Sequence, residues 1–230
     1  MSRILQKTSH WLKKAGRGFT NLYRGSWYKK TVVWIITCVL SVILLLIAVD
    51  LNFLYLFGKS PGFKDIEHPV TSEASEIYSA DSVLIGRFFS ENRTPVEYED
   101  ISPIIIQTLI DTEDERFYRH HGIDFQGLFA AVKDIASGRA RGASTITQQL
   151  AKNLFRVRTQ YSTGLLGKIP GVKILVMKAK EWIVAVKLEM IFSKEEILTM
   201  YFNTVDFGSN SFGIKTACRT YFNTTPDQLT

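Results

Sequence analysis

One short stretch, 112–125, gathers the side-chain types that carry protons in enzymes. Its sequence is TEDERFYRHHGIDF. Glu113 and Asp114 stand close to Phe117 and His120, and aromatic neighbours of this kind favour burial. A carboxylate held beside apolar groups binds its proton more tightly than one in water, which suits a general acid or base near neutral pH. The stretch therefore indicates an acid–base centre.

Two other interpretations of this stretch were weighed. A metal site usually offers histidines at helical i, i+4 spacing or clustered cysteines, whereas His120 and His121 are adjacent and Cys38 and Cys218 lie far apart. A solvated helix end is the commoner use of such charges, but the aromatic residues among them favour a pocket wall. We therefore expect no metal site, and we expect His121 to be a surface residue.

A second polar group lies at 141–153, with the sequence RGASTITQQLAKN. Ser144 could cap a helix here, and residues three or four apart on that helix share a face. Free N–H groups at a helix N-terminus attract anions, and hydroxyl, amide and ammonium groups add further donors. The donors are Ser144, Thr145, Gln148, Gln149, Lys152 and Asn153. The pattern indicates a phosphate-binding face, with a merely solvated face as the open alternative.

A third group lies in VMKAKEWIVAVKLE, where Lys178 and Lys180 stand beside Glu181 on an otherwise apolar helix. Surface salt bridges between Glu and Lys are the simpler interpretation of this group alone. Together with Glu113, however, the chain offers two separate carboxylates and a set of cations. Such a combination could transfer a sugar from a phosphate-linked donor.

Several helices must position these groups. Asp124 is a good N-cap for a helix whose apolar residues recur on one face over 125–136. A long helix is predicted at 172–192. Ser193 and Glu196 then form a capping box for the next helix. The part of the chain beyond residue 100 is therefore expected to be mainly α.

A membrane helix is expected ahead of these elements. Residues 31–57 are almost entirely apolar, and no charged residue occurs from Thr31 to Val49. About 20 apolar residues in a helix cross the bilayer core. Eight basic residues and no acid occur in 1–30, which predicts a cytoplasmic N-terminus and an exported remainder. A cleaved signal peptide is the alternative, although the apolar run exceeds a signal core.

The remaining composition is that of a globular protein. Hydrophobic residues make up 46% and charged residues 22% of the chain, which excludes extensive disorder. The net charge of +6 comes from the basic tail, so no nucleic-acid binding is expected. Residues 58–100 are polar and suit a stalk, and two β-rich runs around Ala80 and Asp81 predict a small hairpin.

Five stretches occur in the order and spacing of a known set of motifs. They are TEDERFYRHHGIDF, GASTITQQLAKNLF, KAKEWIVAVKLE, ILTMYFN and FGSNSFGIKTACRTYF. They resemble the motifs of the peptidoglycan glycosyltransferase family, found in class A penicillin-binding proteins and monofunctional transglycosylases. The resemblance covers about 101–222 and implies a lysozyme-like, mainly α fold with a small membrane-associated subdomain.

The resemblance implies polymerisation of lipid II into β-1,4-linked glycan strands with release of undecaprenyl pyrophosphate. Glu113 is similar to the catalytic base, and Glu181 to the second essential carboxylate. A single displacement would invert the anomeric centre, unlike a retaining glycosidase with a carboxylate nucleophile. A non-catalytic membrane-tethered scaffold and a lysozyme-like glycan-cleaving enzyme remain as alternatives.

The implied substrate-binding residues come from all three polar groups. They are Asp114, Phe117, His120, Ser144, Thr145, Gln148, Gln149, Lys152, Asn153, Lys178 and Lys180. Met177 departs from the family pattern, which has arginine there, and Arg156, Arg158 and Lys173 are candidate substitutes. Asn210 stands where the family often has glycine, and Asn tolerates the positive φ that such a turn requires.

The resemblance also implies a location and partners. The implied organisation is a basic cytoplasmic tail, a transmembrane helix, a stalk and a glycosyltransferase domain, at 1–30, 31–57, 58–100 and 101–230. We expect the cytoplasmic membrane, with the catalytic domain on its outer, periplasmic face. Lipid II and the growing glycan are the expected substrates, and other cell-wall synthesis proteins are candidate partners. No cofactor is required by the sequence, although Mg²⁺ or Mn²⁺ could accompany the substrate pyrophosphate.

Two further segments carry expectations. Leu165, Leu166, Ile169, Ile174 and Leu175 occur among basic residues, which indicates a segment lying on anionic lipid, with core packing as the alternative. The C-terminal TTPDQLT begins like a helix that does not continue. The domain is therefore expected to be truncated, as the N-terminal part of a bifunctional penicillin-binding protein, and a following transpeptidase domain is left open.

Overall fold

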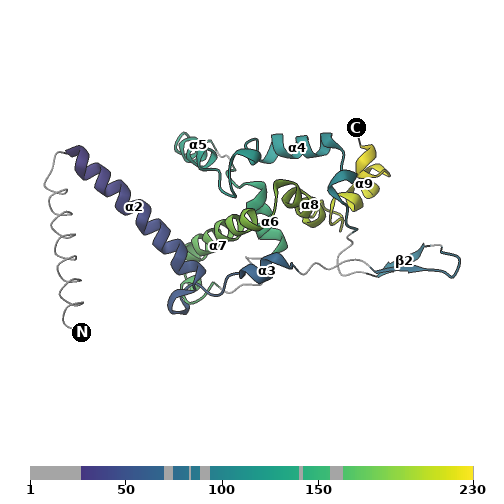
Figure 1. Ribbon diagram of the computed structural model, residues 1–230, viewed down its shortest axis with the longest axis horizontal. Helices are drawn as coiled ribbons and strands as arrows, with labels where there is room; N and C mark the ends of the chain where they lie inside the picture. The colour runs from purple at the N-terminus through teal and green to yellow at the C-terminus, as the bar shows by residue number, and fades with distance from the viewer. Residues whose placement is uncertain are drawn as a thin grey trace, which may run out of the picture. The chain divides into compact units, whose positions relative to one another are not determined.

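The computed structural model is mainly helical, as expected (Figure 1). Contacts divide the chain into two compact units, 1–48 and 49–230. The structure describes residues 27–69, 75–82, 84–88, 94–139, 142–155 and 163–229.

The N-terminal helix, α2, covers Trp27–Asp50 and is long and apolar enough to cross a membrane, alone among the described helices. Most of its apolar side chains are exposed, as in a lipid-facing helix rather than a core helix. The predicted span at 31–57 is shifted. The helix ends at Asp50 because Asn52 and Leu54 adopt left-handed φ values of 48° and 51° in the following turn.

The second unit carries the remaining elements. Beyond α2 the helices are α3 (Phe63–Glu67), α4 (Pro103–Glu113), α5 (Phe125–Ala136), α6 (Ile146–Leu154), α7 (Pro170–Ile191), α8 (Lys194–Thr204) and α9 (Ile214–Phe222). Short 3₁₀ turns cover Phe53–Tyr55, Tyr98–Asp100, Phe117–Arg119, Leu166–Lys168 and Pro226–Gln228. The predicted hairpin is confirmed, since β1 (Ser75–Tyr78) pairs antiparallel with β2 (Leu84–Phe88).

The core lies where α6 packs against both α7 and α8. Ile146 and Leu150 of α6 are fully buried, as are Val184 and Leu188 of α7. Burying side chains of this size contributes about 1.5–3 kcal/mol each. The three helices that carry the second, third and fourth motifs are therefore held together by their apolar faces.

Two of the three predicted helix caps are confirmed. Asp124 accepts the Gly127 N–H and caps α5, and Ser193 with Glu196 forms the predicted capping box of α8. The cap of α6 is Thr145 rather than Ser144, since the Thr145 hydroxyl accepts the Gln148 N–H. Because Ser144 does not cap α6, its hydroxyl accepts a hydrogen bond from Lys178 of α7.

Residues ahead of 101 contribute to the same core. Ile66 is fully buried and Val96 is 5% exposed, and both belong to the main hydrophobic cluster. The Val96 N–H also bonds to the Asn203 side chain at 2.9 Å. The second compact unit begins at Val49 and includes the segment that was expected to form a stalk, 58–100.

Two apolar surfaces remain exposed. On α5, which lies apart from the α6–α8 group in Figure 1, Phe125 and Phe129 are more than two thirds exposed. The second surface includes Leu165, Ile169, Ile174 and Leu175, all more than half exposed. Core packing of these four residues, the alternative weighed above, is therefore wrong.

Candidate active site

Glu113 is the last residue of α4, and its side chain is exposed. The Gln149 amide of α6 donates to its carboxylate at 2.6 Å. The Tyr201 hydroxyl of α8 donates in turn to the Gln149 carbonyl oxygen at 3.2 Å. Three helices thus meet at this carboxylate, which is accessible to an incoming hydroxyl group.

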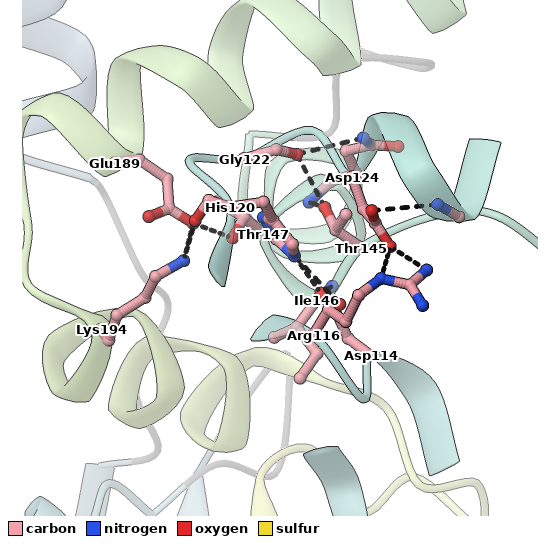
Figure 2. Close-up of polar contacts among 12 residues, drawn as sticks. Asp114, Arg116, His120, Gly122, Asp124, Thr145, Ile146, Thr147, Glu189 and Lys194 are labelled. Carbon is pink, nitrogen blue, oxygen red and sulfur yellow. Dashed lines mark hydrogen bonds and ion pairs between the residues drawn. The ribbon is translucent and has the colours of Figure 1, made fainter. Parts of the chain in front are cut away.

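Asp114 is 7% exposed and has a different environment. Its carboxylate accepts the Ile146 N–H at 3.0 Å and His120 Nε2 at 3.0 and 3.1 Å (Figure 2). The side chain therefore satisfies a backbone donor at the start of α6. Asp114 shapes the site by joining the first motif to the second, and it does not present a carboxylate to a substrate.

These contacts also limit the expected anion site at the start of α6. The Ile146 N–H is bound by Asp114 and the Gln148 N–H by Thr145. Two backbone donors of the first turn are therefore already paired inside the protein. An anion near this helix would depend mainly on side-chain donors.

Two sets of contacts fix the loop between α4 and α5. Arg116 bonds to Asp124 at 2.6 Å. Burial alone would raise the pKa of Asp124, but the hydrogen bonds from Arg116 and from the Gly127 N–H hold that pKa below its usual value. Gly122 has φ 83°, and a Cβ there would lie 2.8 Å from the Ala185 backbone, so only glycine fits against α7.

The Gly122 carbonyl accepts hydrogen bonds from two of the residues that were expected to bind substrate. It accepts the Thr145 hydroxyl at 2.8 Å (Figure 2). It also accepts the Gln148 amide at 3.1 Å. Both side chains are at least 98% buried. Thr145 and Gln148 therefore hold the first motif against the second, and their donors are not directed to a substrate.

A second polar network lies behind the loop (Figure 2). Glu189 accepts the Thr147 hydroxyl at 2.6 Å and the Lys194 ammonium at 2.8 Å. Lys194 also donates to the His120 carbonyl at 2.8 Å and lies 4.2 Å from the centre of the Phe117 ring. The network joins α6, α7 and α8 to the loop between α4 and α5.

Sequence reasoning missed this network. Glu189 and Lys194 occur within or next to the third motif, but nothing in their spacing distinguishes them from solvated charges. Phe117 and His120, which were expected at the site, are both buried. They support the loop from inside, and exposed His121 confirms its expected surface position.

Lys178 and Glu181 bring the third motif to the second. Glu181 is 1% exposed, and Lys178 bonds to it at 3.0 Å. The same ammonium donates to the Ser144 hydroxyl at 2.9 Å and to the Gln148 carbonyl oxygen at 3.2 Å. Four of the predicted site residues, Ser144, Gln148, Lys178 and Glu181, therefore lie together.

Lys180 has a different role from the one expected. It is fully buried and donates to the carbonyls of Gly58 and Lys59, at 3.1 and 2.6 Å. Burial lowers its pKa to about 8. Residues two apart on a helix point about 200° apart, so Lys178 and Lys180 cannot share a face. Lys180 joins α7 to the segment that follows α2.

The remaining predicted residues are less constrained. Gln149 bonds to Glu113, as described above, and keeps a second amide hydrogen. Lys152 and Asn153 are half-buried on α6, and their side chains make no hydrogen bond to the part of the chain that the structure describes. Arg156 and Arg158, two of the candidate substitutes for arginine at Met177, lie outside the described residues. Asn210 has φ 58°, which confirms that it adopts the turn conformation expected of it.

A small cleft brings the first two motifs together. It holds about 60 Å³ of space and is lined by Glu113, Asp114, Glu115, Arg116, Asp124, Gly127, Gly142, Ala143, Ser144 and Thr145. The described residues contain no group of three His, Cys, Asp or Glu side chains that could hold a metal ion. The cleft thus contains the exposed carboxylates of Glu113 and Glu115, and its Ser144 hydroxyl accepts a hydrogen bond from Lys178 of α7.

Comparison with known proteins agrees with the motifs. Residues 81–230 match the family described as Transglycosylase. The chain is 41% identical over 157 residues to penicillin-binding protein 1A of Escherichia coli, a match that covers 67% of the chain and 17% of the relative. It is 36% identical over 204 residues to penicillin-binding protein 1F of Bacillus subtilis, which covers 88% of the chain and 26% of the relative.

The chain thus spans between a sixth and about a quarter of the length of these curated relatives. The matched residues contain Glu113, its partners Gln149 and Tyr201, and the Lys178–Glu181 pair. Family match and site geometry therefore concern the same part of the chain. The chain belongs to the transglycosylase family, and residues 81–230 form a glycosyltransferase domain related to those of class A penicillin-binding proteins.

Proposed function

We propose that this chain polymerises lipid II into β-1,4-linked glycan strands, with Glu113 as the general base. The observation that carries the proposal is the accessible Glu113 carboxylate, held by Gln149 beside a cleft that also contains Ser144. A base must reach the proton that it removes, and Asp114 is buried. Glu113 and Glu115 are both exposed, and Glu113 is the one that Gln149 holds in place.

The proposed reaction is a single displacement. Glu113 takes the proton from the 4-hydroxyl of the acceptor sugar, and that oxygen attacks the anomeric carbon of the donor. The bond from this carbon to the pyrophosphate breaks as the new glycosidic bond forms, so the configuration inverts. The proton remains on Glu113 until solvent removes it, and undecaprenyl pyrophosphate leaves with the electron pair.

The leaving pyrophosphate gains negative charge and is stabilised by cations placed in advance. Lys178 and Lys152 are the proposed cations, with Ser144, Gln149 and Asn153 as uncharged donors. Glu181 orients Lys178 through their 3.0 Å contact. Because two further acceptors also bind the Lys178 ammonium, it has little freedom to move away from α6.

A divalent cation is proposed to act only with the substrate. Of the other acids of the cleft, Asp114 and Asp124 already accept two donors each from the protein, and Glu115 is exposed. A metal ion held by the protein is therefore not part of the proposal. Mg²⁺ or Mn²⁺ would be bound by pyrophosphate oxygens, and activity after chelation should return when either ion is added together with lipid II.

We also propose that the chain is anchored in the cytoplasmic membrane with its N-terminus inside. Helix α2 supplies the span, and the basic residues ahead of it favour the cytoplasmic side. The lipid tail of the substrate would then reach the domain from the outer leaflet. The whole protein, for which a bifunctional penicillin-binding protein is the proposal, could bring further cell-wall synthesis proteins to this site.

The test is to incubate labelled lipid II with the chain in detergent and to resolve the products by length on a gel. Longer glycan is expected. A scaffold would leave lipid II unchanged, and that result would contradict the proposal. A glycan-cleaving enzyme would instead shorten preformed, labelled glycan, which serves as the second substrate in the same experiment.

A further inference from the structure

A chain of two hydrogen bonds connects the protein core to the proposed base. Gln149 donates to Glu113 at 2.6 Å, and Tyr201 donates to Gln149 at 3.2 Å. Tyr201 is 4% exposed and packs edge-on against Phe202, with ring centres 6.0 Å apart. The exposed carboxylate is thus linked to a fixed side chain through one amide.

We propose that Tyr201 is a positioning residue that orients the Gln149 amide toward Glu113. The inference rests on the proposed function, in which Glu113 is the base. It adds a residue of the fourth motif, on α8, to the proposed active site that Glu113 of the first motif and Gln149 of the second form.

The donors and acceptors permit one arrangement when Glu113 is ionised. A carboxylate only accepts hydrogen bonds, so Gln149 must present its NH₂ group to Glu113. The Gln149 carbonyl oxygen then faces Tyr201, which must donate. The reverse orientation would put two oxygens, one of them charged, against each other.

Tyr201 is suited to remain a donor. Burial, together with the nearby Glu113 charge, raises the pKa of Tyr201 to about 12. The hydroxyl therefore keeps its proton throughout the range in which a carboxylate base works. A free glutamine on a surface samples many rotamers, and fixing one of them in advance removes that entropic cost from the reaction.

The test compares Tyr201→Phe, Gln149→Leu and the double variant, all in the full chain. Tyr221→Phe is the matched control. Tyr201 and Tyr221 line one largely apolar pocket, but Tyr221 donates its hydroxyl to the Phe207 carbonyl at 2.9 Å. Initial rates of lipid II polymerisation are measured against substrate concentration and pH. Thermal unfolding of each variant is recorded alongside.

Tyr201→Phe should lower kcat about ten-fold with little change in KM, since a hydrogen bond to a charged group is weakened. The acid limb of the rate profile should move to higher pH in Tyr201→Phe and in Gln149→Leu. A carboxylate that loses a donor is protonated more readily. Asp114, Glu115, Arg116 and Asp124 also line the cleft and are unchanged in every variant.

The double variant decides whether Tyr201 acts through Gln149. If it does, the double variant is no slower than Gln149→Leu alone. The inference is overturned if the two losses multiply, or if Tyr201→Phe matches Tyr221→Phe in kcat and in its acid limb. An unshifted acid limb in Gln149→Leu overturns it as well, whatever the stability of Tyr201→Phe.

Glu113→Gln separates this inference from the proposed function. If Glu113→Gln polymerises at the parental rate, the assignment of the base fails and the inference fails with it. If Glu113→Gln is inactive and Tyr201→Phe behaves as the parent does, only the positioning role of Tyr201 is wrong.

Discussion

Glu113 and Asp114 are neighbours in sequence with opposite environments. Glu113 is exposed at the end of α4, whereas Asp114 points inward and accepts donors from Ile146 and His120. The sequence indicated both acids without dividing their roles. The division depends on where α4 ends, because the backbone turns between the two residues and sends their side chains in different directions.

Asp114→Asn should destabilise the chain by about 1–3 kcal/mol, because one oxygen that accepts inside the protein becomes an amide donor. The loss should appear in the free energy of unfolding, measured with denaturant in detergent. Glu115→Gln is the control, since Glu115 is the exposed neighbour. Equal stability of the two variants would contradict the role given to Asp114.

At the scale of elements, sequence patterns predicted which residues form helices but not which neighbours pack against those helices. The Asp124 and Ser193 caps and the turn at Asn210 follow from local chemistry, and each is present in the structure. The cap of α6 is Thr145 rather than the predicted Ser144, although Ser is the more common N-cap residue. Local patterns cannot separate such neighbours.

Tertiary contacts account for the rest of what the sequence could not predict. Lys180 was grouped with Lys178 because both stand near Glu181, yet the helix turns them to different sides. The apolar stripe of α5 was expected from periodicity, but periodicity does not say whether a partner covers it. Glu189 and Lys194 meet only because α7 and α8 fold back on each other.

The buried Lys180 should make the free energy of unfolding depend on pH. Its pKa is about 8 in the folded chain, against 10.5 for the usual side chain. Between these values the unfolded chain binds more protons, so stability rises with pH through this window. The free energy of unfolding of the parent should therefore increase, relative to Lys180→Met, from pH 8 to 10.5.

Denaturation in detergent at several pH values measures this difference. Lys173→Met, which changes an exposed lysine of the same helix, should show the slope of the parent. If Lys180→Met and the parent change in parallel over the window, Lys180 is not a buried ammonium in the folded chain.

At the scale of the whole molecule, the chain combines one candidate membrane helix with a domain that exposes apolar side chains. The segment containing Leu165 and Leu175 is tied to the residues after α2, since the Leu166 N–H donates to the Leu56 carbonyl at 3.0 Å. We therefore expect this surface to contact lipid close to the point where the membrane helix ends.

Spin labels test this expectation in nanodiscs. With Cys38 and Cys218 replaced by Ser, a label at Leu175→Cys should be relaxed strongly by oxygen, which concentrates in lipid. A label at Thr199→Cys on α8 should respond mainly to a water-soluble nickel complex. Equal responses at the two positions would show that the 163–175 surface does not lie in lipid.

The most direct test of the central claim is the polymerisation of labelled lipid II by Glu113→Gln beside the parent, with lipid II binding measured for both. The amide has the shape of the carboxylate but cannot take a proton. The account predicts full-length glycan from the parent, and at least a hundred-fold slower polymerisation by a variant that still binds lipid II. Polymerisation by Glu113→Gln at the parental rate would contradict the account.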